Sequence, residues 1–161
     1  MNTTFTIAPA SERDVPTILR MIKALAEYEK LIHAVVATED RLRRTLFGPN
    51  PAAEVLMAYA GEQPAGFALF FHNYSTFLGQ RGVYLEDLFV VAEWRGHGLG
   101  RQLLSRLAAI ALERDCGRLE WSVLDWNAPA IGFYRKLGAV PMDDWTIMRM
   151  IGEPLERLAA G

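Results

Sequence analysis

The sequence has few of the features that would place a protein outside the cell or in a membrane. Its 161 residues include a single cysteine, Cys116, which excludes a disulfide within the chain and is typical of a reducing compartment. No apolar run reaches the roughly 18 residues that span a bilayer. The N-terminus has no basic segment followed by an apolar one, so we expect no secretory signal and a cytoplasmic protein.

Charge of one sign is also scarce. The formal net charge is −2, which gives no broad attraction to nucleic acid or to anionic lipid, and neither is expected as a partner. His33, His72 and His97 are not spaced as metal ligands, so we expect no bound metal. The sequence has no repeat, low-complexity segment or linker, and we predict one domain over residues 1–161.

The spacing of apolar residues predicts alternating groups of strands and helices. We predict strands over residues 5–8, 55–60, 65–71, 83–91, 119–124 and 146–151, and helices over residues 11–31, 38–47, 98–116 and 127–137. Residues 72–82 are polar and aromatic and are predicted to form an exposed loop. This order predicts an α/β (α+β) fold with a mixed, mostly antiparallel central sheet flanked by helices.

The most informative stretch joins the fourth predicted strand to the helix that follows it, and reads Arg95-Gly96-His97-Gly98-Leu99-Gly100. Glycines let the backbone approach a ligand closely, and the free N–H groups and dipole at a helix start favour a phosphate. The lysine of a nucleotide P-loop is missing. The stretch predicts either a loop for a phosphorylated cofactor, with Arg95 and Arg101 as phosphate partners, or a plain helix start with flexible glycines.

The loop resembles motif A of the GNAT superfamily of N-acetyltransferases, in which backbone amides bind the pyrophosphate of acetyl-CoA. Residues 22–29 (IKALAEYE), 84–90 (YLEDLFV) and 126–139 (WNAPAIGFYRKLGA) resemble its diamine (spermidine/spermine) and thialysine acetyltransferase branch. These matches are in the family's order and cover nearly the whole chain. The resemblance implies a GNAT fold, transfer of an acetyl group from acetyl-CoA to a primary amine of a small molecule, and a homodimer.

The resemblance further implies that acetyl-CoA, as co-substrate, contacts the strand before the loop, the loop itself and the helix after Asn127. The implied cofactor residues are Leu88, Phe89, Val90, Arg95, Gly96, His97, Gly98, Leu99, Gly100, Arg101, Asn127, Ala128, Pro129 and Ala130.

Two side chains match the family's catalytic residues. Tyr134 matches the tyrosine that protonates the departing CoA thiolate, although its helix position also suits a core residue. Glu86 matches the glutamate at the substrate amine, which acts as a base through water or as an electrostatic anchor. An alkyl amine with a pKa of about 10.4 must lose a proton before it attacks a thioester. Asp87 is a weaker candidate, because strand alternation points it away from Glu86 unless a bulge intervenes.

The amine itself is left open by the sequence. The residues that match the family's substrate wall are Tyr28, Glu29, Glu86, Trp121 and Asp143. Polyamine enzymes of the branch carry an acid before the central strand and an arginine at the place of Thr146, whereas residues 72–82 here contain no acid. A diamine or polyamine and a lysine-like amino acid are both candidate substrates. The amino acid would need a partner for its carboxylate, with Arg81 and Arg135 as candidates.

Two other classes of function compete with an acetyltransferase. A non-catalytic acyl-CoA-binding regulatory module would share the glycine loop but would need neither Glu86 nor Tyr134. A nucleotide-dependent phosphotransferase would need a P-loop lysine and a magnesium-binding acid, and the sequence shows no such pattern. The joint presence of Glu86 and Tyr134 favours the acetyltransferase.

Overall fold

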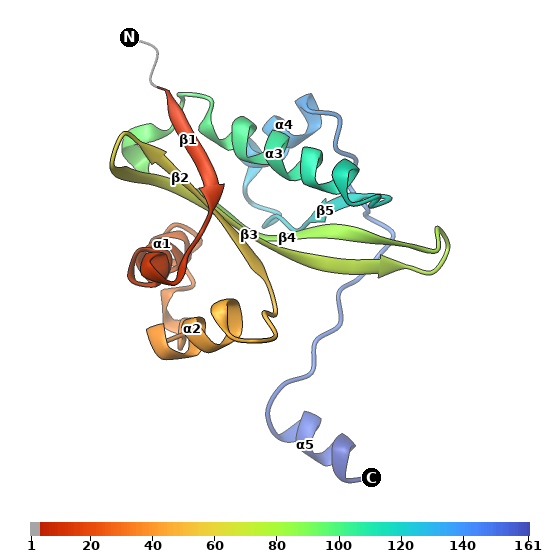
Figure 1. The fold of residues 1–161 in the computed structure, drawn as a ribbon. Helices are drawn as coiled ribbons and strands as arrows, with labels where there is room; N and C mark the ends of the chain where they lie inside the picture. The colour runs from red at the N-terminus through yellow and green to blue at the C-terminus, as the bar shows by residue number, and fades with distance from the viewer. Residues whose placement is uncertain (1–3) are drawn as a thin grey trace. The chain divides into compact units, whose positions relative to one another are not determined.

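A five-stranded sheet organises residues 4–122, the first of two units in the computed structural model, which describes residues 4–161. Its strands, in order across the sheet, are β1 (Phe5–Pro9), β2 (Glu54–Ala60), β3 (Gln63–Ser75), β4 (Gln80–Val90) and β5 (Leu119–Trp121) (Figure 1). β1 to β4 pair antiparallel with their neighbours, whereas β4 and β5 are parallel. The predicted mixed, mostly antiparallel sheet is confirmed.

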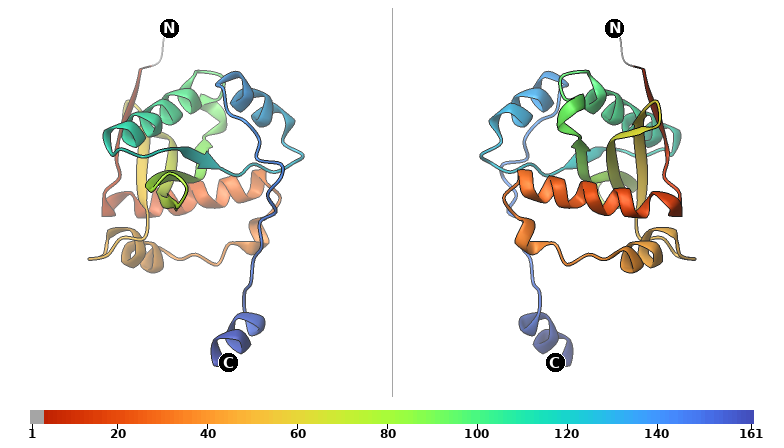
Figure 2. Two further views of the ribbon diagram at one scale, coloured as in Figure 1. Left: turned by 90° about the vertical axis from the view of Figure 1, so that its right-hand side faces the viewer. Right: turned by 90° about the vertical axis from the view of Figure 1, so that its left-hand side faces the viewer.

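Helices cover both faces of this sheet (Figures 1 and 2). α1 (Val15–Tyr28) and α2 (Glu39–Phe47) lie on one face, and α3 (Leu99–Glu113) lies on the other. Short 3-10 turns occur at η1 (Glu12–Asp14), η2 (Ile32–Ala34) and η3 (Ala92–Trp94). None of the helices in the described part of the chain has the length and apolar character needed to cross a membrane.

Each face of the sheet has its own apolar layer. The layer with α1 and α2 contains Val15, Ile18, Met21, Leu42, Leu46, Val55, Met57, Phe67 and Phe89. The buried residues of α3 are Leu99, Leu103, Leu104, Leu107, Ile110 and Ala111. Full burial of one such large apolar side chain stabilises the fold by about 1.5–3 kcal/mol. The two layers therefore hold β3 and β4 firmly between helices.

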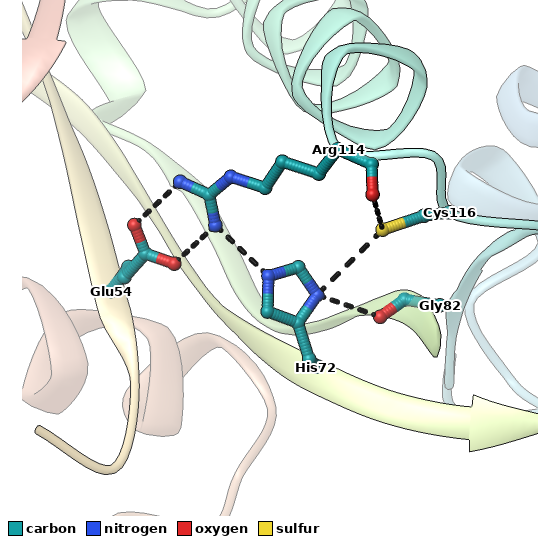
Figure 3. Close-up of polar contacts among 5 residues, drawn as sticks. All are labelled: Glu54, His72, Gly82, Arg114 and Cys116. Carbon is teal, nitrogen blue, oxygen red and sulfur yellow. Dashed lines mark hydrogen bonds and ion pairs between the residues drawn. The ribbon is translucent and has the colours of Figure 1, made fainter. Parts of the chain in front are cut away.

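A polar network ties the end of α3 to the sheet (Figure 3). Two guanidinium nitrogens of Arg114 donate to the Glu54 carboxylate at 2.6 and 2.8 Å. Arg114 also lies 2.9 Å from Nε2 of His72, whose Nδ1 lies 3.0 Å from the Gly82 carbonyl. Because that carbonyl only accepts, Nδ1 carries the proton and Nε2 accepts from Arg114. The Arg114 bonds lower the pKa of Glu54, so this contribution to stability is lost only as the pH falls below a glutamate's ordinary range.

The predicted loop over residues 72–82 is wrong. β3 continues to Ser75 and β4 begins at Gln80, so only residues 76–79 form the turn. The pairs Asn73–Gly82 and Tyr74–Arg81 extend the antiparallel ladder. The partner strand supplies the hydrogen bonds here, which the polar local sequence does not indicate.

α1 ends at Tyr28, before the predicted end near residue 31. The Leu31 N–H donates to the Ala26 carbonyl at 2.7 Å, a bond typical of the Schellman motif that closes many helices. Lys30 occupies the left-handed position of this motif with φ of 62°, a position that favours glycine. The turn fixes the backbone of Tyr28 and Glu29, which the sequence predicts to face the amine.

α3 ends in the same way at Glu113, before Gly117 and before the predicted end at residue 116. Asp115 takes the left-handed position with φ of 52°, and the Cys116 N–H donates to the Ala111 carbonyl at 2.8 Å. Gly117 instead lets the β3–β4 hairpin approach, because a Cβ there would lie 2.7 Å from Cδ1 of Leu78.

The C-terminal unit, residues 123–161, contains α4 (Ala128–Lys136) and α5 (Glu153–Ala160). Asn127 caps α4, since its Oδ1 accepts from the Ala130 N–H at 3.4 Å, and Gly138 closes the helix with φ of 95°. The predicted strand over residues 146–151 is wrong, because these residues lie outside any helix or strand. Alternating side chains make a strand only where a neighbouring strand completes the ladder.

Replacing Lys30 by glycine should give a more stable protein than replacing it by alanine. Both variants lose the same side chain, but only glycine adopts the left-handed backbone without a steric cost of about 1 kcal/mol. Urea denaturation of Lys30→Gly and Lys30→Ala measures the difference. Equal unfolding free energies would show that the backbone at this position is unstrained.

Candidate active site

β4 separates from β5 before β4 ends. β5 pairs with β4 only at Val83, Tyr84 and Leu85, and no strand in the described chain pairs with residues 86–90 on that side. The last residues of β4 therefore carry backbone groups that form no hydrogen bonds with a described strand on that side. A strand with free backbone groups is suited to hydrogen bonding with an extended ligand.

The ladder with β3 shows which backbone groups these are. The Val91 N–H donates to the Ala65 carbonyl at 2.9 Å, and Phe89 is paired with Phe67. In an antiparallel ladder the backbone groups of successive residues face opposite sides. Those of Leu88 and Val90 consequently face the β5 side, whereas those of Phe89 face β3.

A bulge interrupts β4 just before this segment. Asp87 is opposite Leu69 of β3, and the next β3 residue, Phe70, is opposite Leu85. Glu86 is therefore an extra residue with no β3 partner, and side-chain alternation breaks there. Asp87 shares the face of Leu69, which packs on the layer with α1. The alternation argument that separates Glu86 from Asp87 does not hold in this strand.

Three carboxyl groups interact around the bulge: Glu29, Glu86 and Asp87, which we call the acid cluster. Burial, and after it the negative charges of Glu86 and Glu29, raise the pKa of Asp87 to about 6. Burial also raises the pKa of Glu29, the C-cap residue of α1. The C-terminal end of α1 adds partial negative charge. Crowded negative charge of this kind favours a bound cation, which lowers the cost of ionising each acid.

The glycine loop connects η3 to α3. Gly96 and Gly98 have φ of 79° and 82°, a conformation that other residues rarely adopt. The Gln102 N–H donates to the Gly98 carbonyl at 3.1 Å, so the N–H groups of residues 99–101 precede the first helical hydrogen bond. With the helix dipole, these N–H groups suit a phosphate.

Two basic side chains flank the loop in different ways. Arg101 is exposed in the first turn of α3. Arg95 turns back along β4, where its Nε donates to the Val90 carbonyl at 2.9 Å and its guanidinium lies over the ring of Tyr28. His97 stays within the loop, since its Nδ1 lies 2.9 Å from the Arg95 carbonyl.

The aromatic residues predicted at the amine also lie along β4. Tyr28 is 44% exposed at the end of α1. Trp121, the last residue of β5, pairs with Leu85 directly before the bulge. All of the predicted substrate residues except Asp143 therefore lie around one segment of β4: Tyr28, Glu29, Glu86 and Trp121.

The remaining predicted residues belong to the C-terminal unit. Tyr134 is half-buried on α4, and its ring centre is 5.5 Å from that of Phe133. Asn127 caps the start of the same helix. Asp143 is exposed in a turn in which the Trp145 N–H donates to the Met142 carbonyl at 3.2 Å.

Asp87 is the residue that the sequence undervalues. Its pair of acids with Glu86 is visible in the sequence, but regular alternation ranks it second. The extra residue in β4 appears only when the register with β3 is known, because that register depends on contacts far apart in the chain.

Comparison with known proteins agrees with this geometry. Residues 20–139 match the Acetyltransferase (GNAT) family. The chain belongs to this family. Thialysine N-epsilon-acetyltransferase of Sus scrofa is 40% identical to it over 95% of this chain and 96% of that protein. L-ornithine N5-acetyltransferase NATA1 of Arabidopsis thaliana is 32% identical over 92% of this chain and 85% of that protein.

Structural comparison gives the same family fold. Integron cassette protein VCH_CASS6 of V. cholerae has a TM-score of 0.82 and 26% identity, over 100% of this chain and 99% of that one. The GNAT fold is thus confirmed, and the protein is an N-acetyltransferase with acetyl-CoA as co-substrate. The alternative of a non-catalytic module is set aside. Within residues 4–161, no group of three or more His, Cys, Asp or Glu residues could hold a metal ion.

Substituting Asp87 by asparagine should flatten the pH dependence of the GNAT protein's stability. The folded state raises the pKa of this carboxyl from 3.8 to about 6, so the folded protein holds the proton more tightly than the unfolded chain. The wild type therefore loses stability as the pH rises between these two values. Asparagine does not titrate, so the variant lacks this part of the pH dependence.

Urea denaturation at several pH values between about 4 and about 7 tests this linkage. Asp144→Asn, at an exposed aspartate of the C-terminal unit, is the matched control and should keep the wild-type slope. A wild-type slope in Asp87→Asn would contradict the assigned environment of the carboxyl.

Proposed function

We propose that this enzyme acetylates a primary amine of a small cationic molecule by direct attack of the amine on acetyl-CoA. The observation that carries the proposal is the acid cluster directly before Leu88 and Val90, whose backbone groups face the side of β4 on which no described strand pairs with them. One strand would thus hold both reactants. The cluster would receive the ammonium group, and the strand would bind the arm of the acyl donor.

The acid cluster supplies the attraction for the amine. A unit charge about 4 Å from a carboxylate near a protein surface gains about 4 kcal/mol. Tyr28 and Trp121 offer aromatic rings beside the same segment, and a cation packs favourably against such rings. The combination selects a charged, flexible amine over a neutral one.

The donor would be held by backbone groups. The N–H groups at the start of α3 suit its pyrophosphate, and those of Leu88 and Val90 suit its extended arm. Asn127, Ala128, Pro129 and Ala130 at the start of α4 complete the set that the family resemblance implies. Phe89 would act through packing, because its backbone groups face β3.

The chain's acids and tyrosine would manage two protons. The amine arrives protonated, with an ordinary pKa of about 10.4, and Glu86 or Asp87 would take its proton directly or through water. The freed nitrogen forms a bond to the thioester carbon as the carbon–sulfur bond breaks. The sulfur leaves as a thiolate with an ordinary pKa of about 8.5, and the Tyr134 hydroxyl would protonate it. The acylated nitrogen would then lose its second proton, which restores the Tyr134 hydroxyl.

The side-chain amine of a lysine-like amino acid is the favoured substrate, with a diamine or polyamine as the alternative. Two relatives are named for thialysine and ornithine, and residues 72–82 supply no acid for a second ammonium group. Arg81, five residues before Glu86 on β4, and Arg135 on α4 are the proposed candidates for a partner of the amino acid's carboxylate.

The test is thiol release from acetyl-CoA with a panel of amines. Lysine, ornithine and thialysine should give higher kcat/KM than spermidine or a simple diamine. Tyr134→Phe should lower kcat by about 10²-fold or more while acetyl-CoA affinity stays close to wild type. Tyr74→Phe, at an exposed tyrosine of the hairpin, is the control. Acetyl-CoA binding without turnover of any primary amine would falsify the proposal.

We further propose one cytoplasmic GNAT domain over residues 1–161 that acts as a homodimer. A unit of about 40 residues such as 123–161 seldom folds alone, which supports one domain. The C-terminal unit exposes many large apolar side chains: Val140, Met142, Trp145, Ile147, Met148 and Ile151. Such a surface is typical of an interface.

Analytical ultracentrifugation should give twice the monomer mass. Ile147→Glu combined with Ile151→Glu should shift the protein toward monomer, because charge does not tolerate burial at an interface. A monomer in the wild type would contradict the dimer while leaving the acetyltransferase proposal intact.

A further inference from the structure

The side chain of Arg95 links residues on both sides of the proposed reaction. Its Nε donates to the Val90 carbonyl at 2.9 Å. Its guanidinium carbon lies 5.2 Å from the ring centre of Tyr28 and 5.6 Å from that of Phe89. Arg95 is the first residue of the glycine loop, so one side chain connects the end of α1, the end of β4 and the loop.

These contacts use the shape of the guanidinium as well as its charge. The planar group can stack on an aromatic ring and donate a hydrogen bond from its edge at the same time. A lysine ammonium could keep the charge near Tyr28 but could not hold both contacts with this geometry. A contact between a cation and an aromatic ring is favourable, and it is stronger where water is excluded.

The position of these contacts gives them a functional consequence. The Val90 backbone faces the gap beside β5, where the donor's arm would lie. Tyr28, at the C-terminal end of α1, directly precedes Glu29 of the acid cluster. A displacement of Arg95 would thus reach the donor through Val90 and the amine through Tyr28.

We propose that Arg95 is a positioning residue that couples the amine side of the site, through Tyr28, to the donor strand, through Val90. This inference rests on the proposed acetyltransferase function. It differs from a role as a phosphate partner, in which the guanidinium would leave these contacts to bind the pyrophosphate.

The experiment is a double-mutant cycle between Arg95 and Tyr28. The variants are Arg95→Lys, Arg95→Gln, Tyr28→Leu, and the combination of Arg95→Gln with Tyr28→Leu. Steady-state kinetics give KM for the amine and kcat, and titration calorimetry gives Kd for acetyl-CoA. Arg44→Lys, an exposed arginine of α2, is the control for a change of arginine to lysine.

Positioning predicts that Arg95→Lys raises the amine KM about 5-fold or more and leaves the acetyl-CoA Kd within about 3-fold. Tyr28→Leu should have a similar effect, and the combined variant should be little worse than either single one, because both break the same contact. Tyr28→Phe keeps the ring and should keep the coupling.

If Arg95→Lys resembles wild type, Arg95→Gln weakens only acetyl-CoA, and the effects of Arg95 and Tyr28 multiply, then Arg95 is a phosphate ligand and the proposal is wrong. If wild type turns over no amine, the proposed function fails. The cycle is then read from denaturation midpoints, and additive shifts would overturn the Arg95–Tyr28 coupling on its own.

Discussion

Crowding of like charges at the bulge in β4 is the constraint on which the site depends. One extra residue, Glu86, brings the alternation of the strand out of step and leaves Asp87 on the face of α1. There the half-buried carboxyl meets the charges of Glu86 and Glu29, and its pKa rises to about 6. The fold tolerates this cost because two apolar layers hold β4 from both faces. The proposed cationic substrate would offset the same cost.

The fold also presents the backbone groups to which the acyl donor is proposed to bind. β5 leaves β4 after Leu85, and the ladder with β3 turns the backbone of Leu88 and Val90 toward the resulting gap. The same chain direction leads into the glycine loop and the start of α3. The proposed sites for the amine, the donor's arm and the pyrophosphate thus follow one another along β4 and the loop after it, and Arg95 lies where the three would meet.

Much of this could be predicted from local sequence. Helix periodicity and the glycines before α3 are local signals, and the structure confirms the helices that they predict. The wrong predictions concern strands, which depend on pairing with residues far apart in the sequence. Residues 72–75 and 80–82 form strands because each segment provides the hydrogen-bonding partners of the other. Residues 146–151 have alternating side chains but form no strand. The bulge belongs to the same class, because register is a property of two strands.

The most direct test of the account is a carboxyl NMR titration of Asp87, with and without a saturating lysine-like amine. The account predicts a midpoint near pH 6 in the free enzyme and a lower midpoint when the amine is bound, because the ammonium charge stabilises the carboxylate. A free-enzyme midpoint at the ordinary aspartate value, or one that the amine leaves unchanged, would contradict the claim that the bulge builds the amine site.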